Sequence, residues 1–189
     1  YYYYQKKKKL KIYEVYQYVH HPLFLKIKSL LKKKIIGDIK YVESSFKIPL
    51  NDQKNFRFKK KLGGGALMDV GAYPLSILFF LFKDSKYKII KKKINISKIN
   101  KLDTSGSVIL NFGKNSICNF SWGFNMPYEN YLKIVGIKGS MYAKFIFSKK
   151  IVQGCEIKIF SNNKHKTIII NKANQINLAF DYFLNTKTN

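Results

Sequence analysis

Asp69 and Tyr73 are the side chains of this sequence whose types and spacing suit proton transfer, and Arg57 precedes them. Asp69 and Tyr73 are four residues apart, so on a helix they lie on one face, one turn from each other. The glycines Gly63 to Gly65 come just before them and permit a backbone turn that residues with side chains would not tolerate. A carboxylate and a phenol presented together beside such a turn can form a site for proton transfer. Arg57 stands out because it is the only arginine in a chain where lysine and arginine together number 36.

Several of these residues also have a purely structural interpretation. Asp69 could cap a helix or make a structural hydrogen bond. Arg57 could bind a substrate or cofactor, or it could tie its loop to the glycine turn. Gly64 and Gly65 could let the backbone approach a ligand, or they could form a plain turn into a helix. His21 precedes a proline, and this position favours a role in shaping the bend between two elements over a catalytic role.

The elements that must position these side chains follow from the hydrophobic periodicity. Helices are expected over 22–34, 66–82 (interrupted by Pro74) and 175–184, and a polar loop over 51–62. Strands are expected over 10–16, 39–48, 87–96, 107–112, 116–124, 131–137, 141–147, 156–160 and 166–170, with a hairpin turn at 113–115. The order helix, strand, helix and then a run of strands predicts an α+β fold with a mostly antiparallel open sheet and helices on one face.

The high positive charge of the chain suggests nucleic-acid binding, but the kind and distribution of its basic residues argue against it. A formal charge of +26 and a pI of about 10.0 are typical of nucleic-acid-binding proteins. However, the positive charge is almost all lysine, it is scattered through every segment, and arginine matches phosphate better. The joint excess of lysine, isoleucine, asparagine, tyrosine and phenylalanine is what an A/T-rich coding sequence gives, so a nucleic-acid partner is the weakest expectation.

The remaining composition indicates a cytoplasmic protein. Cys118 and Cys155 form no disulfide framework, no cysteine–histidine spacing suggests zinc, and no metal site is expected. The apolar run 75–82 is too short to cross a bilayer, so no membrane partner is expected. The N-terminus lacks the charged-then-apolar order of a signal peptide, and a chain that does not begin with methionine is expected to be a fragment.

The order and spacing of several blocks resemble those of a known family, whose name is usually written Gfo/Idh/MocA, for glucose-fructose oxidoreductase, inositol dehydrogenase and rhizopine catabolism. The blocks are Glu14 to Pro22, Ile36 to Ile39, Asn55-Phe56-Arg57, Gly63 to Pro74, Leu102 to Phe112 and Ile134 to Ser140. The resemblance is to the C-terminal domain of the family and covers nearly the whole chain. Tyr73 in place of histidine at the end of Asp-x-x-x-Tyr is similar to the glucose-fructose oxidoreductase and dimeric dihydrodiol dehydrogenase branch.

The resemblance implies an NAD(P)-dependent oxidoreductase that acts on a sugar, sugar derivative or diol hydroxyl and assembles as a homodimer or homotetramer through the open sheet face. It implies that Tyr73 is the proton donor or acceptor, with Asp69 beside it. It also implies that Arg57, Tyr18, His21, Gly64 and Gly65 lie on the substrate or cofactor side.

The sequence also departs from the family pattern. It contains no GxGxxG after a strand and no Glu-Lys-Pro, where the family keeps its catalytic lysine. Both belong to the Rossmann domain, so that domain is expected to be absent and the cofactor to be bound mainly outside this chain. Residues 1–12 would be the remnant of its last helix and linker, and residues 13–189 the substrate-binding and oligomerisation domain. Val19 stands where many relatives carry arginine. The alternative is a catalytically inactive fragment that acts only as an oligomerisation module.

Overall fold

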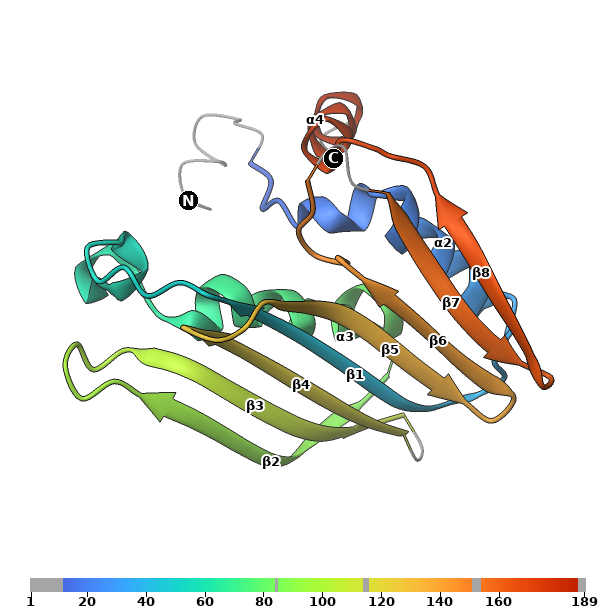
Figure 1. The fold of residues 1–189 in the computed structure, drawn as a ribbon, viewed down its shortest axis with the longest axis horizontal. Helices are drawn as coiled ribbons and strands as arrows, with labels where there is room; N and C mark the ends of the chain where they lie inside the picture. Colours follow the sequence, from blue (N-terminus) through green and yellow to red (C-terminus); the bar gives the residue numbers. More distant parts are fainter. Residues whose placement is uncertain (1–11, 84, 114–115, 151–153, 187–189) are drawn as a thin grey trace.

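An eight-stranded sheet in the order β2-β3-β4-β1-β5-β6-β7-β8 organises the molecule (Figure 1). The computed structural model describes residues 12–83, 85–113, 116–150 and 154–186. The strands are β1 (Ile39–Ile48), β2 (Tyr87–Ile96), β3 (Asp103–Phe112), β4 (Ser116–Phe124), β5 (Glu129–Gly136), β6 (Gly139–Lys144), β7 (Cys155–Ser161) and β8 (Lys164–Ile170). The helices and helical turns are η1 (Gln17–His20), α2 (Pro22–Lys32), η2 (Phe56–Phe58), η3 (Lys60–Leu62), η4 (Leu67–Gly71), α3 (Ala72–Phe82) and α4 (Gln175–Asn185).

The pairing of the strands explains why the sheet is mostly antiparallel. Strands that follow one another along the chain from β2 to β4, and again from β5 to β8, pair as antiparallel neighbours. Only β1 and β4 run parallel, because the helical segment between β1 and β2 carries the chain across the sheet. The predicted α+β fold with an open, mostly antiparallel sheet is confirmed.

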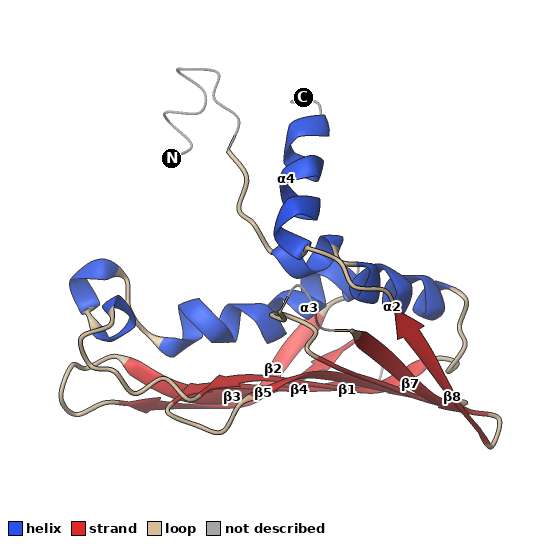
Figure 2. Ribbon diagram, turned by 45° about the horizontal axis from the view of Figure 1, so that its top comes forward, coloured by secondary structure: helices blue, strands red, loops and turns tan. Residues whose placement is uncertain are grey.

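The described helices all lie on one side of the sheet, and no described element covers its other, bare face (Figure 2). Alternate residues of β1 therefore meet different surroundings. Val42 and Phe46 are buried toward the helices, whereas Tyr41 and Glu43 lie on the bare side, hereafter the open face. The same alternation makes Phe120 part of the covered core.

The helical segment that carries the candidate site begins with a wide turn. Residues Leu67–Gly71 form a π-turn, and α3 continues from Ala72. Pro74 has no N–H to donate to the carbonyl of Val70, four residues earlier, and a π-turn is a way in which a helix accommodates a missing bond. The predicted interruption of this helix at Pro74 therefore takes the form of a widened turn just before the proline.

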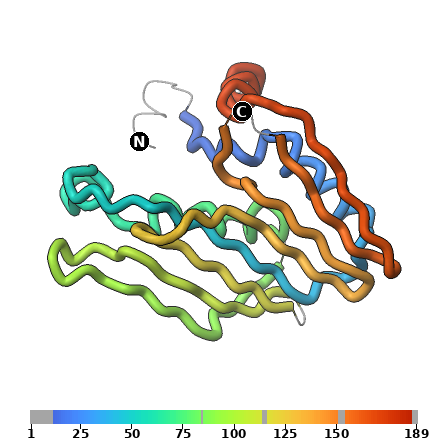
Figure 3. Tube along the Cα trace, in the orientation of Figure 1, coloured from blue at the N-terminus to red at the C-terminus, as the bar shows by residue number. Residues whose placement is uncertain are grey.

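The N-terminal segment differs from its prediction. Residues 12–16 form no strand, and residues 10–11 of the predicted strand lie outside the described residues. The Tyr13 hydroxyl is 2.8 Å from Nε2 of His20, and the Tyr13 ring centroid is 5.6 Å from that of Tyr182 on α4. Over residues 12–16 the predicted strand was wrong, because the described contacts of Tyr13 are with a helical turn and a helix and not with a strand. The trace shows this segment and α4 on the same side of the molecule (Figure 3).

One smaller difference has a local cause, and two further predictions fall largely on residues that the structure does not describe. The strand expected over 141–147 ends at Lys144, because Phe145 has a positive φ of 54° that turns the chain out of the sheet. The hairpin expected at 113–115 joins the antiparallel pair β3 and β4, and residues 114–115 lie outside the described residues. The expected remnant at 1–12 also lies outside them, apart from Ile12.

One segment of the described chain, Lys60–Phe82, is long and apolar enough to cross a membrane when judged by length and composition alone. In the structure its helical part lies against the sheet, and Val70 and Ile77 are buried in the core. A core helix passes the same test of length and composition, so the packing explains the apolar run.

Candidate functional site

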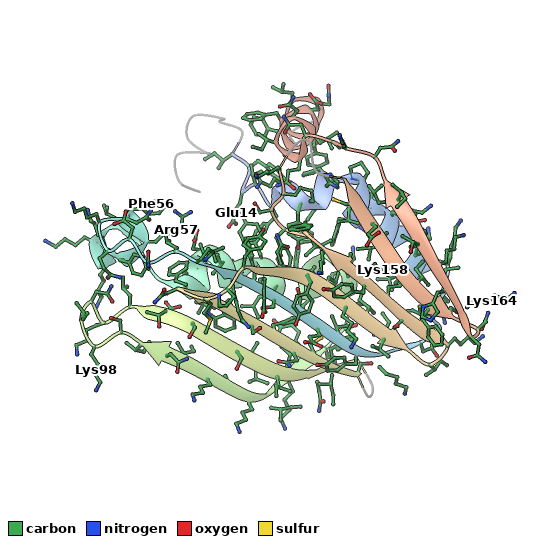
Figure 4. All side chains as sticks on the ribbon, viewed as in Figure 1. Glu14, Phe56, Arg57, Lys98, Lys158 and Lys164 are labelled. Carbon is green, nitrogen blue, oxygen red and sulfur yellow. The ribbon has the colours of Figure 1, made fainter. Side chains whose placement is uncertain are left out.

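Arg57 and Asp69 form an ion pair at one end of the sheet. Nε of Arg57 donates to Oδ2 of Asp69 at 2.5 Å, and their side chains are 30% and 28% exposed. Arg57 lies in the turn η2, which is capped by Asn55: the side chain of Asn55 accepts a hydrogen bond from the Arg57 N–H at 3.1 Å. The guanidinium also lies 4.6 Å from the ring centroid of Phe56. Figure 4 places Phe56 and Arg57 at the end of the molecule where the β2–β3 turn carries Lys98.

A partly exposed ion pair adds less than about 1 kcal/mol to stability, so its larger effect here is on orientation. The Arg57 side chain joins η2 to the wide turn, and the backbone joins them again, because Gly65 N donates to the Arg57 carbonyl at 3.0 Å. Of the two interpretations of Arg57, the structure shows the link between its loop and the glycine turn. A role toward a ligand is compatible with it, since the side chain still reaches solvent.

The glycine turn has a steric requirement at Gly64 and Gly65. A Cβ on Gly64 would collide with the carbonyl of Arg57, and a Cβ on Gly65 would collide with Oδ1 of Asp103. Gly65 also has a φ of 127°, which residues with side chains rarely adopt. The two glycines thus allow the chain to pass close to Arg57 and Asp103 before the helical segment begins.

Tyr73 lies in the first turn of α3, half buried in a wall of aromatic rings. Its ring centroid is 5.4 Å from Phe46, 5.8 Å from Tyr16 and 5.8 Å from Phe147. These rings come from β1, from the N-terminal segment and from the chain after β6, so Tyr73 is held where three distant parts of the sequence meet. A rigid aromatic wall of this kind fixes the direction in which the phenol points.

The surroundings raise the pKa of the Tyr73 phenol above its ordinary value of 10.0. The largest cause is burial, and the negative charge of Asp69 and the neighbouring Tyr16 act in the same direction, whereas Arg57 opposes them. In this domain alone Tyr73 is therefore protonated at neutral pH and able to donate its proton. As expected from their spacing, Asp69 lies close enough to Tyr73 for its charge to raise the pKa of the phenol. The two residues are separated by the wide turn and not by a regular helical turn.

Tyr18 is fully buried beneath Tyr73. Its hydroxyl lies 2.6 Å from Oγ of Ser76, and Ser76 Oγ in turn donates to the backbone carbonyl of Tyr73 at 2.7 Å. Burial raises the pKa of Tyr18 well above its usual range. Tyr18 thus contacts the backbone of α3 through Ser76, and its hydroxyl is directed to the protein interior.

His21 caps helix α2, away from the Arg57–Asp69 pair. Its Nδ1 accepts a hydrogen bond from Leu23 N at 3.0 Å, and the side chain is 1% exposed. Nε2 faces the backbone of Ala173 without a well-aligned hydrogen bond. Burial and the nearby charge of Lys149 lower the pKa of His21 to about 4, so the imidazole is neutral at pH 7. The described contacts of His21 therefore shape the bend before α2, the role that the sequence favoured.

The structure therefore brings together Arg57, Asp69, Gly64, Gly65 and Tyr73, and it places Tyr18 below them and His21 at a separate helix start. Two further residues take part that were not predicted as site residues: Ser76 within α3, which links Tyr18 to this helix, and Asp103, which contacts Leu67 from β3. Their contacts with Tyr18 and Leu67 span 58 and 36 residues of sequence, and no local pattern predicts such partners. The described residues contain no group of three or more metal-binding side chains.

Comparison with known proteins relates this geometry to a family. Residues 24–142 match the model of the GFO/IDH/MocA C-terminal domain. The chain is 28% identical over 129 residues to dTDP-3,4-didehydro-2,6-dideoxy-alpha-D-glucose 3-reductase from Streptomyces violaceoruber, a match that covers 68% of this chain and 37% of the relative. It is 27% identical over 163 residues to trans-1,2-dihydrobenzene-1,2-diol dehydrogenase from Xenopus laevis, covering 85% of this chain and 48% of the relative. The chain thus spans less than half the length of these relatives.

Solved structures share the fold. KijD10, a 3-ketoreductase from Actinomadura kijaniata solved with NADP and TDP-benzene, superposes with a TM-score of 0.86 at 21% identity. The match covers 94% of this chain and 55% of that one. Aldose-aldose oxidoreductase from Caulobacter crescentus superposes with a TM-score of 0.81 at 18% identity, covering 94% of this chain and 54% of that one. At these identities the likeness establishes the fold.

Proposed function

Because this chain belongs to the GFO/IDH/MocA family through its C-terminal domain, we propose that it is the substrate-binding domain of an NAD(P)-dependent oxidoreductase acting on a sugar, sugar derivative or diol hydroxyl. The observation that carries the proposal is the half-buried phenol of Tyr73 beside the Arg57–Asp69 pair. The relatives, which are named as a sugar-nucleotide 3-reductase and a dihydrodiol dehydrogenase, support the substrate class.

Tyr73 is the proposed proton donor and acceptor. When bound, the nicotinamide supplies or receives the hydride at the substrate carbon. In the direction of reduction, the Tyr73 phenol gives its proton to the substrate oxygen, and its raised pKa keeps it in the donor form. In the direction of oxidation, Tyr73 must lose a proton, and a cation near the phenol lowers the cost of that state. Arg57 acts in this sense from within the domain.

We propose that the cofactor is bound mainly by a nucleotide-binding domain of the intact protein. This chain has no GxGxxG of its own. Next to the outer face of α3 lies an open groove of about 740 Å³, lined mostly by apolar side chains that include Tyr16, Leu67, Met68 and Phe79. The groove adjoins Tyr73 through Tyr16, whose ring packs against that of Tyr73, and an apolar groove in this place is compatible with cover by a second domain and its nicotinamide. NAD and NADP both remain candidates, and a cytoplasmic setting is proposed with them.

The test is Tyr73→Phe in the intact enzyme, compared with Tyr87→Phe on the exposed edge strand β2. Loss of the phenolic proton is expected to lower kcat by about 10²- to 10⁴-fold. NAD(P) affinity is expected to stay unchanged, as are all properties of the Tyr87→Phe control. Retention of turnover within a few fold in Tyr73→Phe would remove Tyr73 from the mechanism. The 189-residue chain alone is expected neither to bind NAD(P) tightly nor to catalyse.

A second candidate function is assembly, either together with catalysis or in place of it. The open face carries a connected polar and aromatic group at its centre, because Glu43 accepts hydrogen bonds from Tyr131 at 2.7 Å and from Tyr41 at 3.3 Å. Beside this group, Ile117 on β4 is 41% exposed. We propose that this face joins identical chains into a homodimer or homotetramer.

Sedimentation of the chain tests the assembly. Wild type is expected to sediment as a dimer or tetramer, whereas Ile117→Lys, which adds charge to the open face beside Tyr41, is expected to sediment as a monomer with an unchanged circular dichroism spectrum. Lys98→Glu at the β2–β3 turn is the control for a change of surface charge. A monomeric wild type, or an unchanged oligomer in Ile117→Lys, would contradict the proposed interface. An inactive intact protein that still assembles would favour the module without catalysis.

A further inference from the structure

Asp103 reaches from the sheet to the start of the helical segment that carries Asp69 and Tyr73. It is the first residue of β3, and its Oδ2 accepts a hydrogen bond from the backbone N–H of Leu67 at 2.5 Å. Leu67 is the first residue of the wide turn. The first N–H groups of a helix have no partner within it, and a carboxylate at this place satisfies one of them and complements the helix dipole.

The glycine turn is shaped around this carboxylate. Oδ1 of Asp103 occupies the space that a Cβ on Gly65 would need. On the other side, Gly65 N donates to the carbonyl of Arg57. The start of the helical segment is therefore held from two elements at once, by Asp103 from β3 and by Arg57 from η2.

The position of this contact relates it to the candidate site. Leu67 lies two residues before Asp69, which pairs with the same Arg57. The wide turn then leads directly into α3, so a shift at Leu67 would move Asp69 and rotate the first turn of α3, where Tyr73 lies. The i→i+5 bonds of the π-turn extend over this one turn only, so an anchor from outside helps to set the position of the turn.

We propose that Asp103 is a positioning residue for the proposed reaction: its carboxylate, bound to Leu67 N, fixes the orientation in which Asp69 and Tyr73 meet the substrate. The inference rests on the proposed function, because it assigns Asp103 an effect on catalysis through Tyr73. Displacement of a reacting group by about 1 Å can lower a rate by about 10²-fold, so a cap at this place has an effect on turnover out of proportion to its effect on stability.

The alternative is that Asp103 is an ordinary cap that adds stability alone. The chain offers a matched control in Asn174, whose Oδ1 caps α4 by accepting from Ile176 N and Asn177 N at 3.0 and 3.2 Å. Asn174→Ala and Asp103→Ala each remove a side-chain cap, and only the latter removes one from the segment that carries Tyr73.

Hydrogen exchange on the 189-residue chain tests the local anchor without any cofactor. In Asp103→Ala, amides of residues 66–73 are expected to exchange at least about tenfold faster than in wild type, since a lost cap weakens the helix start. In Asn174→Ala the faster exchange is expected in residues 175–185 and not in 66–73. Unchanged exchange of 66–73 in Asp103→Ala would overturn the inference.

Steady-state kinetics of the intact enzyme test the effect on catalysis. Asp103→Ala is expected to lower kcat by about 10- to 100-fold with KM within about threefold of wild type. Asp103→Asn keeps an acceptor for Leu67 N and is expected to recover kcat to within about fivefold, whereas Asn174→Ala keeps the wild-type kcat. An unchanged kcat in Asp103→Ala, or an equal loss in Asn174→Ala, would overturn the inference. Failure of the proposed function is distinguishable, since it appears as turnover that survives Tyr73→Phe.

Discussion

The two faces of the sheet are built from the same strands, yet they carry different chemistry. On β4, Phe120 points to the helices and is fully buried, whereas Ile117 points to the open face and is 41% exposed. On β1, the covered side contributes Phe46 to the wall around Tyr73, and the open side contributes Glu43 to a cluster with Tyr131. Because alternate residues of a strand point to opposite faces, one stretch of sequence supplies both the candidate site and the candidate interface.

The difference shows where the stability and the chemistry of this domain reside. The covered face contains most of the described buried apolar side chains and the aromatic rings that pack against Tyr73, so its packing decides folding and the geometry of the proposed site. The open face carries hydrogen bonds between polar side chains, such as the 2.9 Å contact of Ser121 with Ser45. Changes on the covered face should therefore alter folding or catalysis, and changes on the open face should alter assembly.

The largest expected effect compares the two faces of β4 directly. Phe120→Ala removes a fully buried ring and is expected to lower the free energy of unfolding by about 3–5 kcal/mol. Ile117→Ala on the open face is expected to cost less than about 1 kcal/mol in the monomer, because its side chain is already partly exposed. Urea unfolding of both variants at a concentration that favours the monomer measures the difference. Equal losses would show that the open face is as well packed as the covered one.

An intermediate effect is expected from the histidine buried on the covered side. The pKa of His21 is about 4 in the folded chain and near 6.5 when unfolded, so the unfolded chain binds the proton more readily. His21 therefore costs no stability above about pH 6.5, and stability falls as the pH drops from there toward 4, by on the order of 3 kcal/mol at most. His21→Asn, which can still cap α2, should make the free energy of unfolding, measured by urea unfolding, depend less on pH in this range.

His165 provides the control for that experiment, because it is exposed on β8. His165→Asn is expected to leave the pH profile as it is in wild type. If His21→Asn has the same pH dependence as wild type between pH 6.5 and 4, the loss of stability in acid arises from other groups, such as Glu129, whose pKa is lowered by its pairing with Lys47.

The smallest effect concerns the charges beside Tyr73. Asp69 raises the pKa of the Tyr73 phenol and Arg57 lowers it. Replacing each by a neutral residue, in Asp69→Asn and Arg57→Gln, should therefore shift this pKa in opposite directions. In the direction of oxidation, where Tyr73 must be deprotonated, the rise of kcat with pH is expected at lower pH in Asp69→Asn and at higher pH in Arg57→Gln. The measurement is the pH dependence of kcat in the intact enzyme. Shifts in the same direction would mean that the loss of the ion pair, and not its charges, controls the phenol.

The sequence predicted the sheet better than it predicted the site. Both β1 and β2 were predicted at their observed bounds, β1 from the alternation of its residues and β2 from its general strand character. Alternation misled over residues 12–16, where Tyr13 packs on His20 and Tyr182 instead of joining a strand. Whether an alternating segment becomes a strand depends on a partner strand, and that is a property of the fold.

The sequence by itself determined the α+β class, the alternation that separates the two faces, and the glycine turn before Asp69 and Tyr73, since these depend on residue type and local spacing. Only the tertiary structure decided which groups meet Tyr73. The hydrogen bond from Leu67 to Asp103 joins residues 36 apart in sequence, and that from Tyr18 to Ser76 joins residues 58 apart. Such contacts form because the sheet brings its strand ends to the start of one helical segment, and no local pattern encodes that meeting.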